Sequence, residues 1–113
     1  MQELERKAYI FSVEAIGLAV SLEKEGNMQE QASGFKQSSG KVYTLLTDAL
    51  EADENKDFAD LLRASHQKAG EALRYLEGIN PGDDALAEKK DELMRMAGEI
   101  IQRLDEILGK IIY

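Results

Sequence analysis

The sequence predicts an all-α protein, an up-down antiparallel four-helix bundle in which residues 1–113 form a single domain. Four stretches repeat apolar residues at alternating spacings of four and three, which is the period of a helix face packed against other helices. The single proline, Pro81, falls between the last two stretches, and hydrophobic residues make up 43% of the chain. That content is enough for a buried core, so one bundle accounts for the whole length.

The first predicted helix, at about residues 3–25, carries two apolar stripes. It should end at Gly26 and Asn27, because glycine readily adopts the left-handed conformation that ends helices. The first stripe comprises Leu4, Ala8, Phe11, Ala15, Leu18 and Leu22, and the second Tyr9, Val13, Ile16 and Val20. Only one of them can face the core of the same bundle, and the sequence leaves open which. We take Tyr9, Val13, Ile16 and Val20 as the predicted oligomer interface.

The second helix is predicted at about residues 28–52 and the third at about 56–78. Their core lines are Met28, Ala32, Phe35, Ser39, Val42, Leu46 and Ala49, then Phe58, Leu62, Ser65, Ala69, Ala72 and Leu76. The link between them has neither glycine nor proline, so Asp53 or Asn55 should cap the third helix, and one fused helix is the alternative. Gly78 with Asn80-Pro81-Gly82 ends the third helix.

The fourth helix, at about residues 83–112, has the strictest heptad and should be capped by Asp83 or Asp84. Its core line is Leu86, Lys90, Leu93, Ala97, Ile100, Leu104, Ile107 and Ile111. Met94, Ile101, Leu108 and Ile112 widen this face, so the first and fourth helices are the expected interface helices. Four glycines, Gly17, Gly40, Gly70 and Gly98, stand singly inside helices, where we expect close helix crossings.

The residues predict no enzyme. His66 is the only histidine, and Arg63 stands where a Glu-x-x-His metal motif would need its glutamate. The chain has no cysteine and no glycine-rich phosphate loop. We therefore expect no catalytic residues, no metal site, no cofactor and no small-molecule substrate.

Charge and hydropathy restrict the partners and the location. The net charge is −8, which argues against tight, nonspecific phosphate binding, yet no acid occurs from Gln31 to Thr47. Lys36 and Lys41 in that segment are the candidate nucleic-acid-binding residues. No apolar run approaches the roughly 20 residues of a membrane span, so no membrane association is expected. The acidic start of the chain differs from a basic secretory leader, and with the lack of cysteine it predicts a cytoplasmic protein.

The middle of the chain resembles a known family. Residues 35–79, FKQSSGKVYTLLTDALEADENKDFADLLRASHQKAGEALRYLEGI, are similar to the central two helices of the four-helix-bundle proteins of large-subunit rRNA intervening sequences. Relatives in that family are the accessory variability determinants of diversity-generating retroelements. Phe35 and Lys36 match the opening of the family's second helix, and Phe58 the opening of its third. Residues 11–22, FSVEAIGLAVSL, are similar to its first helix.

The resemblance implies a non-enzymatic bundle that self-assembles, typically into a five-fold barrel. In the retroelement branch, such a homo-pentamer binds a reverse transcriptase and its RNA or DNA. The chain is thus expected to be an oligomeric scaffold or adaptor, most concretely a retroelement accessory protein. The alternative is an acidic protein-interaction module of the same family with no nucleic-acid role.

Overall fold

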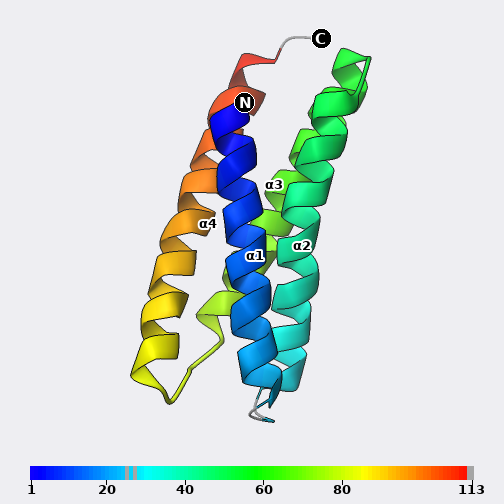
Figure 1. Ribbon diagram of the computed structural model, residues 1–113. Coiled ribbons are helices and arrows are strands. Elements are labelled where there is room, and N and C mark those ends of the chain that lie inside the picture. The colour runs from blue at the N-terminus through cyan, green and yellow to red at the C-terminus, as the bar shows by residue number, and fades with distance from the viewer. Residues whose placement is uncertain (25, 27, 112–113) are drawn as a thin grey trace.

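The computed structural model, which describes residues 1–24, 26 and 28–111, is a bundle of four helices that alternate in direction (Figure 1). The helices are α1 (Gln2–Lys24), α2 (Gln29–Glu51), α3 (Asn55–Glu77) and α4 (Asp84–Lys110). Each helix packs on the next, and α4 packs back on α1. The predicted all-α up-down four-helix bundle is confirmed.

The core lines read from the sequence face the interior. All six residues of the first α1 stripe are buried. Phe11 of that stripe meets Phe35 of α2 edge to face, with ring centroids 6.4 Å apart. In α4, Leu93, Ala97, Ile100 and Leu104 are buried, whereas the flanking heptad positions are half-buried. The helical period therefore identified the buried faces correctly.

The helix ends follow the sequence less closely. A fused second and third helix is wrong, because α2 ends at Glu51 and the backbone is extended at Ala52 and Glu54. Glu54 precedes α3 without a side-chain capping bond, so neither expected cap acts there. At α4, by contrast, the Asp83 carboxylate accepts hydrogen bonds from the amides of Ala85 and Leu86 at 2.7 and 3.2 Å.

Among the described residues of the turn between α1 and α2, two are left-handed. Gly26 has φ 73°, as expected for a helix stop, and Asn27 lies outside the described residues. Met28 also has positive φ, 56°, so α2 begins one residue later than predicted.

The four interior glycines do not mark close crossings within the bundle, contrary to the prediction. A Cβ added at any of Gly17, Gly40, Gly70 or Gly98 would meet nothing within 4 Å beyond its own local backbone and chain neighbours. Gly34 is the position where a small residue is needed, because a Cβ there would lie 2.4 Å from the ring of Tyr75 in α3. The ring of Tyr75 thus packs against the backbone of α2 at Gly34.

No described helix is both long and apolar enough to cross a membrane.

Four buried serines line the contacts of α2 with its neighbours: Ser12, Ser38, Ser39 and Ser65. The Ser12 hydroxyl donates to the Ser39 carbonyl at 2.9 Å, and the Ser65 hydroxyl donates to the Val42 carbonyl at 2.8 Å. The Ser39 hydroxyl itself has no hydrogen-bond partner among the described residues. A buried polar group without a partner destabilises the folded state.

Replacing Ser39 by alanine should therefore raise the free energy of unfolding by up to about 1 kcal/mol. Ser65→Ala is the matched control and should lower it, because a made hydrogen bond is lost. Urea denaturation followed by circular dichroism measures both. A loss of stability in Ser39→Ala equal to that of Ser65→Ala would contradict the prediction.

Candidate oligomer interface

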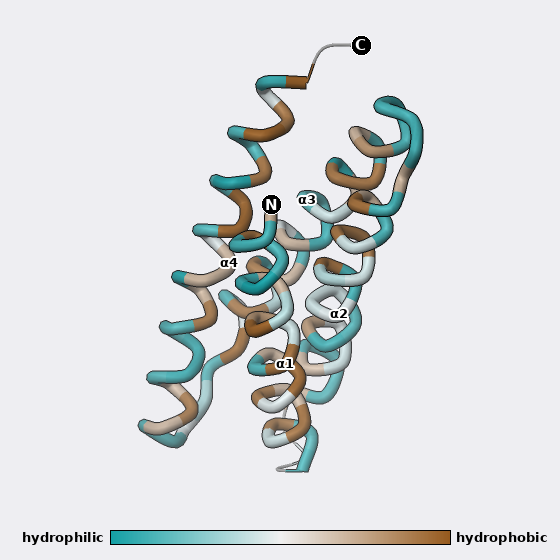
Figure 2. The backbone as a smooth tube through the Cα atoms, turned by 45° about the horizontal axis from the view of Figure 1, so that its top comes forward, coloured by the Kyte–Doolittle hydropathy of each residue, from teal (hydrophilic) through white to brown (hydrophobic). Residues whose placement is uncertain are grey.

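The outward side of α1 is apolar and exposed. It is formed by Tyr9, Ile10, Val13, Ile16, Gly17 and Val20, here called the α1 outer face. The fractions of exposed surface are 53% for Tyr9, 52% for Val13 and 40% for Ile16. Hydrophobic positions recur along this helix from turn to turn (Figure 2). The second stripe is thus the exposed one.

The α1 outer face carries no charge. Glu14 is the single charged residue between Ala8 and Leu22. Its carboxylate accepts a hydrogen bond from the Lys89 ammonium of α4, which turns it away from the outer face. That hydrogen bond raises the pKa of Lys89, because the Glu14 carboxylate stabilises the charged ammonium.

Other charges nearby are also held at the seam between α1 and α4. The Glu99 carboxylate accepts hydrogen bonds from Arg95 at 2.7 Å and from Lys7 at 3.4 Å. These bonds lower the pKa of Glu99, and the bond from Arg95 has the larger effect. The cations of this seam are therefore compensated locally, beside the outer face and not on it.

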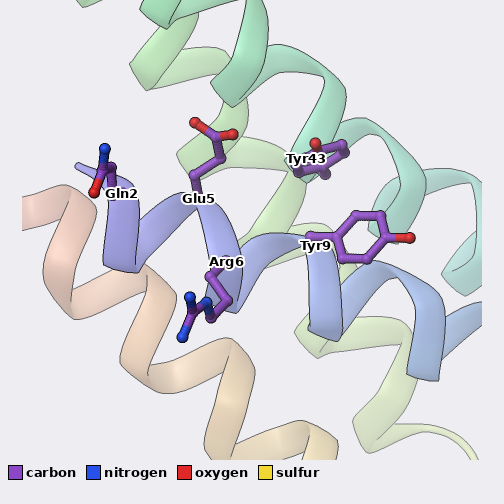
Figure 3. Close-up of a pocket in the computed structure, with 5 residues that line it drawn as sticks. All are labelled: Gln2, Glu5, Arg6, Tyr9 and Tyr43. Atoms are coloured by element: carbon purple, nitrogen blue, oxygen red, sulfur yellow. The ribbon is translucent and has the colours of Figure 1, made fainter.

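On its other side, the α1 outer face continues onto α2. The ring of Tyr9 meets the ring of Tyr43 edge to face, with centroids 5.3 Å apart. A surface hollow beside this pair is lined by Gln2, Glu5, Arg6, Tyr9 and Tyr43 (Figure 3). A molecule that covers the α1 outer face could also contact α2 here. The sequence stripe did not indicate Tyr43, because its neighbour Tyr9 lies on another helix.

Ile10 and Gly17 were also missing from the predicted interface. Ile10 is 42% exposed, yet it lies outside the four-and-three spacing of the second stripe. The signal that could have identified both is the absence of charge: apart from Glu14, every residue from Ala8 to Leu22 is uncharged. The exposed apolar surface of α1 is therefore wider than the stripe of four residues that the spacing predicted.

The two candidate nucleic-acid-binding lysines lie on different sides of α2. Lys36 Nζ lies 3.0 Å from Glu23 Oε1 of α1, which compensates its charge. Lys41 is exposed and follows five residues later, which places it about 140° further around the helix. The structure therefore does not bring the two ammonium groups into one patch. Nucleic-acid binding by either stays a prediction.

A double variant tests these lysines. If both contact phosphate, Lys36→Glu with Lys41→Glu should lose RNA or DNA binding and lower the salt slope by about 0.7–0.9 for each contact. Fluorescence anisotropy against salt concentration measures both quantities. Lys56→Glu with Lys110→Glu is the charge-matched control and should bind as the parent does. Equal binding by both double variants, or no binding by the parent at low salt, would remove these residues from any nucleic-acid role.

His66 of α3 lies against Asp105 of α4. Its Nε2 is 2.7 Å from Asp105 Oδ1, but this nitrogen makes no hydrogen bond among the described residues. Within the described part of the chain, no group of three or more histidine and carboxylate side chains is arranged to hold a metal ion. His66 therefore lies at the contact between α3 and α4.

No known family model matches the chain. The uncharacterized protein YaaN of Bacillus subtilis (strain 168) is 31% identical to it over 96 residues, which are 85% of this chain and 23% of YaaN. The chain thus spans about a quarter of the length of the curated relative that it matches. The similarity to YaaN therefore assigns no activity to this chain.

A solved structure shares the architecture. It is a crystal structure of a protein of unknown function from the S23 ribosomal protein family of Bacteroides thetaiotaomicron VPI-5482. The TM-score is 0.81 over 93% of this chain and 97% of that one, at 20% sequence identity. At this identity the likeness shows a shared helical fold and no shared function. The specific resemblance to rRNA intervening-sequence proteins and retroelement accessory proteins stays a prediction.

Proposed function

We propose that this chain is a non-enzymatic, self-assembling scaffold or adaptor of the cytoplasm whose copies meet through the α1 outer face. The observation that carries the proposal is the exposure of five large apolar side chains on one uncharged side of one helix. Buried apolar area contributes on the order of 25 cal/mol per Å², and extended apolar patches are uncommon on monomers. Association would remove this surface from water.

The charge distribution favours a second copy as the partner. A basic partner would be attracted to free carboxylates at its docking site, whereas none of the six residues of the α1 outer face is acidic. The carboxylates of Glu14 and Glu99 beside the face are paired with cations of the same chain. Two copies that each carry a net charge of −8 repel one another over most of their surfaces. The uncharged face is where two copies can approach at the lowest electrostatic cost.

The finer form of the proposal comes from the resemblance. It implies a five-fold barrel that binds a reverse transcriptase and nucleic acid as a retroelement accessory protein. The alternative is an acidic protein-interaction module without a nucleic-acid role. The ion pair between Lys36 and Glu23 favours this alternative, because it offsets the charge of one of the two candidate phosphate-binding cations. RNA binding at low salt distinguishes the two forms.

Mass in solution tests the proposal directly. Light scattering at micromolar concentration is expected to give a mass several times the 12.6 kDa of one chain. Five copies would agree with the barrel implied by the resemblance. A mass of 12.6 kDa that does not rise with concentration would overturn self-assembly.

A further inference from the structure

A buried ring nitrogen of His66 in α3 faces a carboxylate of α4 without a hydrogen bond. Asp105 Oδ1 lies 2.7 Å from His66 Nε2, yet this nitrogen has no hydrogen-bond partner among the described residues. The contact therefore has a suitable distance without the alignment of a hydrogen bond. A neutral imidazole gains little from such a contact, because it carries no charge.

A protonated His66 interacts with Asp105 in a different way. The imidazolium carries a positive charge, and the attraction between opposite charges depends on their distance and not on the alignment of one N–H group. Histidine gains and loses this proton between about pH 5 and 8. The side chain of His66 is 34% exposed, so protons of the solvent can reach the ring.

The cations of α3 near His66 have carboxylate partners on their own helix. Arg63, three residues before His66, donates to Asp60 at 3.1 Å. Lys68, two residues after it, donates to Glu71 at 3.0 Å. Their charges are therefore offset within α3 and do not take Asp105 away from the imidazole.

α2 packs on α3 and places one charged side chain at the level of the imidazole. That level is given by the Ser65 hydroxyl, which donates to the Val42 carbonyl at 2.8 Å. Lys41 is the one charged residue from 37 to 47, and it is exposed to solvent. Tyr43 is the other titratable residue there, and tyrosine is uncharged between about pH 5 and 8. This stretch of α2 therefore offers the imidazole no carboxylate.

α4 and α1 complete the surroundings of the contact. Arg103 and Glu106 are the other charged residues within one turn of Asp105, and Arg103 donates to Glu106 at 3.1 Å. α1 packs against α4 and has exposed groups at its start, the Met1 amino group and Glu3. Asp105 is thus the carboxylate that the described structure places against the imidazole.

We infer that the contact between His66 and Asp105 is a pH-sensitive attachment of α4 to α3, which protonation of His66 strengthens. Of the four interfaces between helices, that of α1 with α4 is the smallest, so α4 depends mainly on α3. Leu104, beside Asp105 in the chain, is buried in the core. Loss of the proton at higher pH therefore loosens α4 next to the core. The inference is independent of the proposed self-assembly.

Thermal unfolding at different pH values tests the inference. The unfolding temperature of the parent should be about 1–4 °C higher at about pH 5.5 than at about pH 8. The sign follows because stability from a protonated, paired histidine is present at low pH and is lost as the pH rises. Glu71 and Glu99 do not contribute to the difference, since hydrogen bonds from cations lower their pKa values and keep them ionised over this range. All samples should have the same chain concentration.

Three variants identify the pair. Asp105→Asn should lose the temperature difference, because a neutral amide does not attract the imidazolium. His66→Gln should also lose it, because glutamine does not titrate. Glu106→Gln is the matched control: it removes the same charge one residue further along and should keep the difference.

Nuclear magnetic resonance of the imidazole gives a second measurement. His66 is the only histidine, so its ring signals need no assignment and show when the ring gains its proton. The rise in unfolding temperature should accompany that change. A parent whose unfolding temperature does not rise on acidification to about pH 5.5, or an Asp105→Asn variant that keeps the full rise, would overturn the inference. Equal losses in Asp105→Asn and Glu106→Gln would indicate an effect of net charge and would also contradict it.

Discussion

Replacing Leu104 by alanine is expected to lower the free energy of unfolding by about 2–5 kcal/mol. Leu104 is fully buried in α4, whose neighbours are α1 and α3. The variant loses the transfer free energy of the removed atoms and leaves a cavity that rigid helices fill only in part. Urea denaturation monitored by circular dichroism gives the change from the midpoint and slope.

Leu108, one turn later, provides the control for this measurement. It is half-buried, so Leu108→Ala should cost clearly less than Leu104→Ala. A loss below about 1 kcal/mol for Leu104→Ala would contradict the burial of this position. If association contributes to stability, both variants should be compared at the same chain concentration.

The second large effect is expected on assembly. Val13→Glu with Val20→Glu should reduce the mass in solution from a multiple of the chain to about 12.6 kDa. Each glutamate would place a charge within the α1 outer face, and burying an unpaired charge is costly. Helicity should be unchanged, since both positions are exposed in the single bundle. Light scattering and far-ultraviolet circular dichroism measure the two properties.

A matched control is available on α2. Gln37 and Thr44 are exposed and seven residues apart, as Val13 and Val20 are. Gln37→Glu with Thr44→Glu adds the same charge in the same spacing and should leave the mass of the assembly unchanged. If both double variants dissociate, general repulsion between acidic chains explains the effect. If neither does, the copies meet elsewhere.

Much of the fold could be predicted because helical periodicity is a local property. The spacing around Leu104 identified the buried face of α4. Asp83 was one of two recognisable cap candidates, because an aspartate at a helix start can accept from the amides two and three residues ahead. The second helix was predicted to end at about residue 52, and α2 ends at Glu51. No glycine or proline marks this end and neither expected cap acts on α3, which is why the sequence left one fused helix open as the alternative.

Contacts between helices were the least predictable feature. Gly34 is needed because the ring of Tyr75, far away in the sequence, lies against it. Lys36 and Lys41 looked like one basic segment, but Lys36 is paired with Glu23 of α1. Spacing along one helix gives the direction of a side chain and carries no information about which group of another helix it meets.

The sequence by itself determined that the first helix has two apolar stripes, because the positions on a helix surface follow from its period. Only the tertiary structure decided which stripe faces outward. The packing of Phe11 against Phe35 places the first stripe in the core and leaves Tyr9, Val13, Ile16 and Val20 exposed. That choice depends on the shapes of the neighbouring helices, since a stripe is buried only where another apolar surface fits it.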